Sequence, residues 1–138
     1  MRNSLQTLER IKKIEIDEQR RLLMVELGKE DSLQHQISEL IAKYEQEKEF
    51  VMQNPGICDF GAYTKQYLEN RKMLEKQLKD IQIKIEQIRD IMADMFKEQK
   101  TYKIVDENRR KRQQKEFENQ EQKMLDEIGT NTYIKKHL

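Results

Sequence analysis

The sequence contains very few of the residues that interrupt or cross-link a chain. Its 138 residues include one proline, Pro55, one cysteine, Cys58, four glycines and no tryptophan. A single cysteine excludes an intrachain disulfide and is usual for a cytosolic protein. Because proline and glycine break helices, and Gly56 directly follows the only proline, we expect the chain to fold back once, near its middle.

A long hydrophobic run is also missing. No stretch approaches the roughly 20 apolar residues of a transmembrane helix, and the opening segment MRNSLQTLERIKK lacks the apolar block of a signal peptide. Charged residues make up 38% of the chain and hydrophobic residues 36%, which is too polar for a compact domain with a large core. We therefore expect a soluble, cytoplasmic protein without direct membrane insertion, built from long solvated helices with a narrow apolar seam.

Charge of one sign is not in excess. Lysine and arginine together number 27 and aspartate and glutamate 26, so the formal net charge is +1. A balance of this kind gives no general reason to expect an anionic partner. It likewise gives no general reason to expect an anionic membrane, and we expect no nucleic acid as a partner.

The pattern along the chain predicts an all-α fold, a long antiparallel two-helix coiled-coil hairpin whose second helix overhangs the first. The expected elements of this single domain, 1–138, are a helix over 3–53, a turn over 54–60, a helix over 61–128 and a flexible tail over 129–138. Asn3 or Ser4 suits the start of the first helix, and Asp59 suits the cap of the second.

The seam of the second helix is regular. Tyr67, Leu74, Ile81, Ile88, Met95 and Tyr102 recur every seven residues, the spacing of a left-handed coiled coil. Folding back at the turn sets Leu33 beside Ile81 and leaves everything beyond about Lys111 without a partner in the first helix. That overhang still carries apolar residues at helical spacings, namely Phe117, Met124, Leu125 and Ile128. Such residues either lie on solvent or bind a partner, and we favour a partner.

Catalytic patterns are absent from the sequence. His35, His137 and Cys58 do not have the spacing of a metal site, and no glycine-rich phosphate loop occurs. The abundant carboxylates alternate with basic residues, as in i,i+4 pairs on helix faces. We expect no catalytic residue, no cofactor and no metal, and an enzyme is the weakest hypothesis.

Two surface features point to protein partners. The first is a set of basic residues that the hairpin brings to its terminal end: Arg10, Lys12, Lys13, Arg109, Arg110, Lys111 and Arg112. They form either a solvated charged face or a docking surface for an acidic cavity. The second is an aromatic group just past the turn, with Phe60, Tyr63 and Tyr67 beside Leu68, which either packs at the tip or anchors an interface.

These residues carry a resemblance. The opening LERIKKIEIDEQRRLL, the stretch PGICDFGAYTKQYLENRKML and the basic, glutamine-rich helix ending in MLDEI resemble FliJ-type flagellar type III export proteins over nearly the whole chain. The resemblance implies a two-helix coiled coil similar to the central stalk of rotary ATPases. It implies three partners: the flagellar export ATPase hexamer, the cytoplasmic domain of the export gate, and export chaperones. It places the protein peripherally at the cytoplasmic face of the inner membrane.

The resemblance also implies two binding regions. The terminal end and the overhang would enter the ATPase ring and promote its assembly, through Arg10, Lys13, Arg109, Arg110, Arg112, Phe117 and Leu125. The early part of the second helix would contact the export gate, through Tyr63, Tyr67, Arg71, Leu74 and Leu78.

Other readings of the same pattern remain open. An injectisome stalk has the same architecture, and an adaptor or chaperone without an ATPase role needs the same elongated, charged surface. A prefoldin-like hairpin would need a β-hairpin at the turn, for which NPGICDF is too short. A rotary-ATPase stalk usually needs more chain. A self-associating structural coiled coil is disfavoured by the polar outer faces of both helices.

Overall fold

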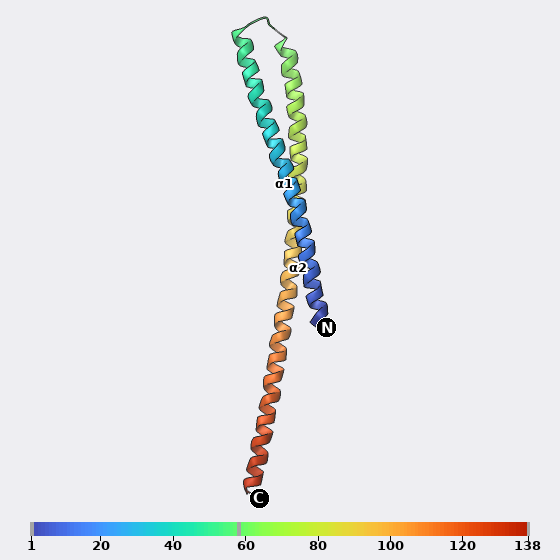
Figure 1. The fold of residues 1–138 in the computed structure, drawn as a ribbon, viewed down its shortest axis with the longest axis vertical. Helices are drawn as coiled ribbons and strands as arrows, with labels where there is room; N and C mark the ends of the chain where they lie inside the picture. Colours follow the sequence, from blue (N-terminus) through green and yellow to red (C-terminus); the bar gives the residue numbers. More distant parts are fainter. Residues whose placement is uncertain (1, 58, 138) are drawn as a thin grey trace. The chain divides into compact units, whose positions relative to one another are not determined.

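The fold consists of two helices (Figure 1). The structure, a computed structural model, describes residues 2–57 and 59–137, and side chains from residue 4 onward. Helix α1 spans Arg2–Gln53 and helix α2 spans Phe60–His137. Within these described residues there is no strand, so the predicted all-α hairpin is confirmed.

The turn forms where Pro55 and Gly56 predict it. Asn54 ends α1 by donating hydrogen bonds back to the Phe50 carbonyl oxygen from its backbone nitrogen, at 3.1 Å, and from its side-chain Nδ2, at 3.0 Å. Gly56 has a φ of 88°, a left-handed conformation that favours glycine. The Asp59 carboxylate accepts a hydrogen bond from the Ala62 amide at 3.3 Å, which is the predicted cap of α2. Cys58 lies outside the described residues.

The chain divides into two compact units. In the unit Ile14–Met95, α1 and α2 run antiparallel, with the turn at one end (Figure 1). Leu33, Tyr67, Ile85 and Ile88 are buried in its seam, and Leu33 and Ile81 line one groove, as the fold-back predicts. Tyr44 stacks on Tyr67, about one turn closer to the loop than the simple fold-back places its partner.

One layer of this seam is charged. Glu26 is only 5% exposed and is the one buried charged side chain in the described part of the chain. Its Oε1 accepts hydrogen bonds from Lys84 on α2 and from Lys29 on α1, both at 3.2 Å. Burial acts to raise the pKa of Glu26, but the two lysines outweigh it and hold the pKa below its ordinary value.

The second unit contains the residues up to Lys13 and those from Phe96 onward. The start of α1 runs along α2 here: Lys12 forms an ion pair with Glu98, and Leu5 is buried beside Asp106 and Arg109. From Glu107 to His137 every residue is exposed. We call residues 107–137 the overhang.

The predicted flexible tail is helical in the structure. We expected the second helix to end at Ile128, but α2 continues through Gly129 to His137. The hydroxyls of Thr130 and Thr132 donate to the carbonyls one turn earlier, at 2.9 and 2.8 Å, and Lys135, Lys136 and His137 are the basic residues that a helix C-terminus favours. Gly129 costs roughly 1 kcal/mol in a helix and does not end it. That all 138 residues form one hairpin domain stays a prediction.

Candidate functional site

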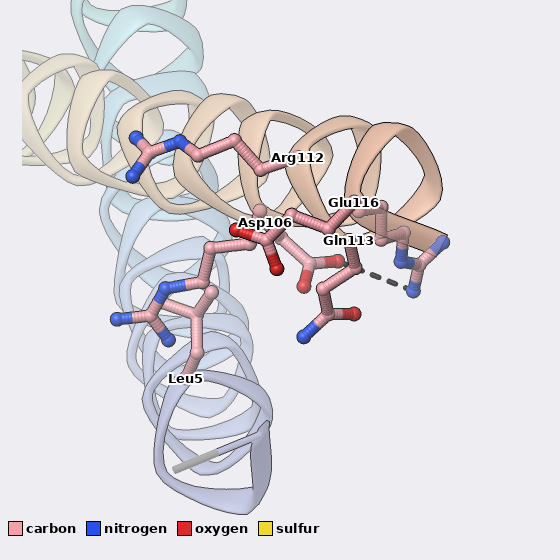
Figure 2. Close-up of a pocket in the computed structure, with 7 residues that line it drawn as sticks. Leu5, Asp106, Arg112, Gln113 and Glu116 are labelled. Atoms are coloured by element: carbon pink, nitrogen blue, oxygen red, sulfur yellow. Dashed lines mark ion pairs between the residues drawn. The ribbon is translucent and has the colours of Figure 1, made fainter. Parts of the chain in front are cut away.

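A small hollow at the start of α1 gathers three of the predicted basic residues. Its volume is about 310 Å³, and Figure 2 shows Leu5 on α1 facing residues of α2 across it. The lining residues are Leu5, Asp106, Arg109, Arg110, Arg112, Gln113 and Glu116. The heptad seam brings them together, because Leu5 occupies a seam position of α1 and Asp106 occupies one of α2.

The charged side chains around this hollow are mostly basic, and the ion pair that they form is exposed to solvent. Arg110 forms an ion pair with Asp106 at 3.2 Å, drawn as a dashed line in Figure 2, and its side chain is 62% exposed. Arg109 and Arg112 are exposed on the same stretch of α2. Exposed ion pairs contribute little to stability, so these guanidinium groups can exchange partners with a bound carboxylate at small cost.

The remaining predicted residues of the terminal end do not line the hollow. Arg10 and Lys13 are exposed on α1, whereas Lys12 is half-buried in its ion pair with Glu98. Phe117 and Leu125 lie farther along the overhang, where their exposed fractions are 62% and 59%. The terminal end therefore combines an arginine-lined hollow with a separate apolar stripe.

The apolar stripe follows one side of the overhang. At about 100° per residue, Phe117, Met124 and Ile128 project within a sector of about 40°, and Leu125 lies about 60° outside that sector. All four are more than half exposed. No described residue of this chain covers them, because α1 begins opposite an earlier part of α2. A stripe of this kind is typical of a helix that packs against another molecule.

An aromatic cluster holds the turn end of the hairpin together. Tyr44 of α1 stacks face to face on Tyr67 of α2, with ring centroids 3.9 Å apart, and also lies against Phe60 and Tyr63. Its hydroxyl is hydrogen-bonded to the Thr64 hydroxyl at 3.1 Å. The sequence interpretation placed Phe60, Tyr63 and Tyr67 together but left out Tyr44, which is the residue that all three rings contact.

Arg71 extends this cluster along α2. It donates one hydrogen bond to Glu75 at 2.9 Å and another to the Tyr67 hydroxyl at 3.1 Å. The hydrogen bond to Glu75, with the one to Tyr67, raises the pKa of Arg71 above its ordinary value. The guanidinium is thus held in a fixed orientation one turn beyond the aromatic rings.

Four of the residues expected at the export gate, Tyr67, Arg71, Leu74 and Leu78, occupy seam positions, and Tyr63 lies beside the seam. Tyr67 is buried, and Tyr63, Arg71, Leu74 and Leu78 are half-buried. Leu68 beside them is 55% exposed. The half-exposed edge of this set is available to another molecule, while the buried part holds α1 and α2 together.

Sequence reasoning missed ion pairs between the helices, including Lys12 with Glu98 and Glu26 with Lys84. Lys12 and Glu26 stand at the same heptad position of α1 as Leu5 and Leu33, and the structure gives each an oppositely charged partner on α2. A charged residue at a seam position was the available indication. In the described ranges 2–57 and 59–137, no group of three or more histidines, cysteines or acidic residues could hold a metal ion. In that part of the chain, neither helix has an apolar stretch suited to crossing a bilayer.

The chain is similar to a known protein family over its whole length. A family model described as "Flagellar FliJ protein" matches residues 1–138, the whole chain. No curated protein and no solved structure matches the chain significantly.

Proposed function

The chain belongs to the FliJ family of flagellar proteins, and we propose that it acts as a stalk that binds the ring of the flagellar export ATPase. The FliJ family is a non-catalytic component of the flagellar type III export apparatus. In our proposal the stalk promotes assembly of the ATPase hexamer and links it to the export gate and to export chaperones. It stays peripheral to the inner membrane, on the cytoplasmic side.

The observation that carries the proposal is the combination of free surfaces at the terminal end. The overhang exposes every side chain from Glu107 to His137, and its first turns carry Arg109, Arg110 and Arg112. Guanidinium groups pair well with carboxylates lining a narrow cavity. The apolar stripe beginning at Phe117 supplies contact area beyond them.

We place the gate contact on α2 near the aromatic cluster. Tyr63, Arg71, Leu74 and Leu78 are half-buried, so their outer edges support binding without opening the hairpin. Tyr67 contributes by fixing this surface, because its hydroxyl accepts a hydrogen bond from Arg71.

The mechanism follows from asymmetry. A single hairpin within a sixfold ring contacts its successive subunits differently. Such contacts bias the nucleotide states of the subunits only if the stalk binds those states with different affinity. The terminal end of the hairpin carries both basic and apolar surfaces. It therefore offers two kinds of contact by which the stalk can distinguish the nucleotide states of the subunits.

The test is to titrate the full chain into the export ATPase of the same organism while following oligomeric mass and ATP turnover together. We expect both to rise. A chain ending after Asp106, and a variant with Arg109→Glu, Arg110→Glu and Arg112→Glu, should bind roughly tenfold more weakly or worse.

The matched control is Lys72→Glu, Lys76→Glu and Lys79→Glu, which changes the net charge equally on an exposed part of the hairpin. It should bind the ATPase as the unaltered chain does. No change in mass or turnover at saturating concentrations of the unaltered chain would falsify the stalk proposal.

The turn end favours a second candidate, an adaptor without an ATPase role. Phe50, Met52 and Ile57 are exposed there by 52%, 75% and 60%. Apolar residues at a hairpin tip suit capture of a partner. This candidate predicts that Met52→Ser and Ile57→Ser impair export while ATP turnover is unaffected. An injectisome stalk remains an alternative of the same architecture, distinguished by which ATPase the chain binds.

A further inference from the structure

A shallow groove runs along one flank of the unit Ile14–Met95. Its volume is about 440 Å³, and its floor is formed by Leu33 and Ile81. Its walls are Lys29 and Ser32 on α1, and Gln77 and Asp80 on α2. We call the side of the hairpin that carries this groove the flank.

The flank continues toward the start of α1 with apolar residues. Leu22 and Val25 precede Lys29 and Ser32 by seven residues, or two turns of the coiled coil, and so lie on the same side of α1. Their exposed fractions are 49% and 56%. On α2, Ile91 follows Gln77 by two such repeats and is 44% exposed.

Charge changes sign along this flank. Lys84, one repeat beyond Gln77, bonds the same Glu26 oxygen as Lys29, which fixes two lysines beside the groove. At the other end, Glu18 and Asp94 stand one repeat beyond Val25 and Gln87 and are exposed. From the start of α1 toward the turn, the flank is therefore acidic at Glu18 and Asp94, apolar at Leu22 and Val25, basic at Lys29 and Lys84, and apolar again at the groove.

The overhang carries the matching order. After the basic run come Phe117, Glu121, Met124 and Ile128. These four side chains project to one side of the helix. The steps from Phe117 to Glu121 to Ile128 are four and seven residues. The steps from Leu22 to the Glu26 layer to Leu33 are also four and seven.

We propose that the overhang of a second copy of this chain docks along the flank, parallel to α1. Phe117 then covers Leu22 and Val25, and Glu121 lies beside Lys29 and Lys84.

In the same register, Met124 and Ile128 cover the groove floor, and Arg110, which precedes Phe117 by seven residues on the same side of the helix, approaches Glu18 and Asp94. One alignment without gaps satisfies the apolar and the charged contacts together, which is why we assign the occupant to this chain and not to an unrelated helix. The inference goes beyond the proposed function and does not rest on it, but both use Phe117, so the dimer and the ATPase complex are alternative states of the overhang.

The test measures the mass of the full chain over a range of concentrations by sedimentation equilibrium. We expect a reversible dimer. Phe117→Ala should raise its Kd by about tenfold or more, because Phe117 is the central aromatic anchor. The control Tyr133→Ala removes an aromatic ring of nearly equal exposure, 62% against 63%, from the opposite side of the overhang and should leave the Kd unchanged.

A matched pair of substitutions on α1 tests the flank. Val25→Ser should weaken the dimer, whereas Met24→Ser, which alters a more exposed neighbour on another side of α1, should not. Both positions are exposed, so neither change should unfold the hairpin.

A cross-linking experiment identifies the register. In a Cys58→Ser background, a chain with Leu22→Cys and a chain with Phe117→Cys should form a mixed disulfide under mild oxidation. Chains that stay monomeric up to about 1 mM, or a dimer equally sensitive to Phe117→Ala and Tyr133→Ala, overturn the proposal.

Discussion

Helix α2 contains two regions that differ in what surrounds them. From Phe60 to Asp106 every third or fourth residue is buried or half-buried against α1, while from Glu107 to His137 every residue is exposed. Both regions contain large apolar residues at helical spacings. Helix formation is therefore the same in both regions, and the presence of α1 decides whether apolar residues become a core.

The spacing of apolar residues changes at the boundary between the two regions. Within the seam they recur every seven residues, but Phe117 follows Tyr102 by fifteen. Fifteen residues make four turns of about 3.75, wider than the 3.5 of a left-handed coiled coil. The overhang is thus not a continuation of the same pairing, and its partner need not resemble α1.

The largest difference between the two regions should appear on truncating an apolar side chain. Ile85→Ala should lower the free energy of unfolding by about 2–4 kcal/mol, because Ile85 is 3% exposed and its loss leaves a cavity. Phe117→Ala should change it by less than about 0.5 kcal/mol. Urea unfolding followed by circular dichroism, at a concentration where the chain is monomeric, checks both. Equal losses would contradict the distinction between seam and overhang.

A smaller effect should follow from pH. The pKa of Glu26 is held below its ordinary value in the folded protein, so its ion pairs add stability above the unfolded pKa. That contribution is lost as pH falls through the lower, folded pKa.

The thermal midpoint of the unaltered chain should therefore fall more between pH 6 and pH 3 than that of Glu26→Gln. The matched change in the overhang is Glu121→Gln, which should leave the pH dependence as it is. Parallel curves for the unaltered chain and Glu26→Gln would contradict the role given to this layer.

The smallest expected effect is that of replacing a glycine within a helix, at Gly28 in the hairpin or at Gly129 in the overhang. An added Cβ would meet no atom within 4 Å at either Gly28 or Gly129. Gly28→Ala should raise the free energy of unfolding by about 0.5–1 kcal/mol, since alanine favours helix. Gly129→Ala should slow amide exchange around residues 125–135 and leave that free energy unchanged. A gain in global stability from Gly129→Ala would show that the overhang unfolds together with the hairpin.

Much of the fold was predictable because few residues decide it. Pro55 and Gly56 fix the turn, Asp59 caps α2, and the seven-residue recurrence from Tyr67 to Tyr102 defines the seam. The end of α2 was not predictable from Gly129, whose helix penalty is small beside the support of flanking side chains. Tyr44 was missed as the centre of the aromatic cluster because its partners come from the other helix, at a register the turn does not specify.

For the candidate binding residues, the exposure was predictable from the sequence, but the partner was not. The exposure of Arg109, Phe117 and Leu125 follows from the unequal lengths of α1 and α2, which the sequence pattern gives directly. The half-buried state of Leu74 and Leu78 follows from their heptad positions. What the sequence pattern leaves open is the identity of the covering molecule, since charged helices accept many partners.

Ion pairs between the helices also act against mispairing. Lys12 pairs with Glu98, and Glu26 pairs with Lys84, so the sign is reversed between sites that lie fourteen residues apart on each helix. A slide of two heptads in one direction would set Lys12 against Lys84, and in the other it would set Glu26 against Glu98. A repeat so regular would otherwise tolerate slips of this length, and the alternation of sign opposes them.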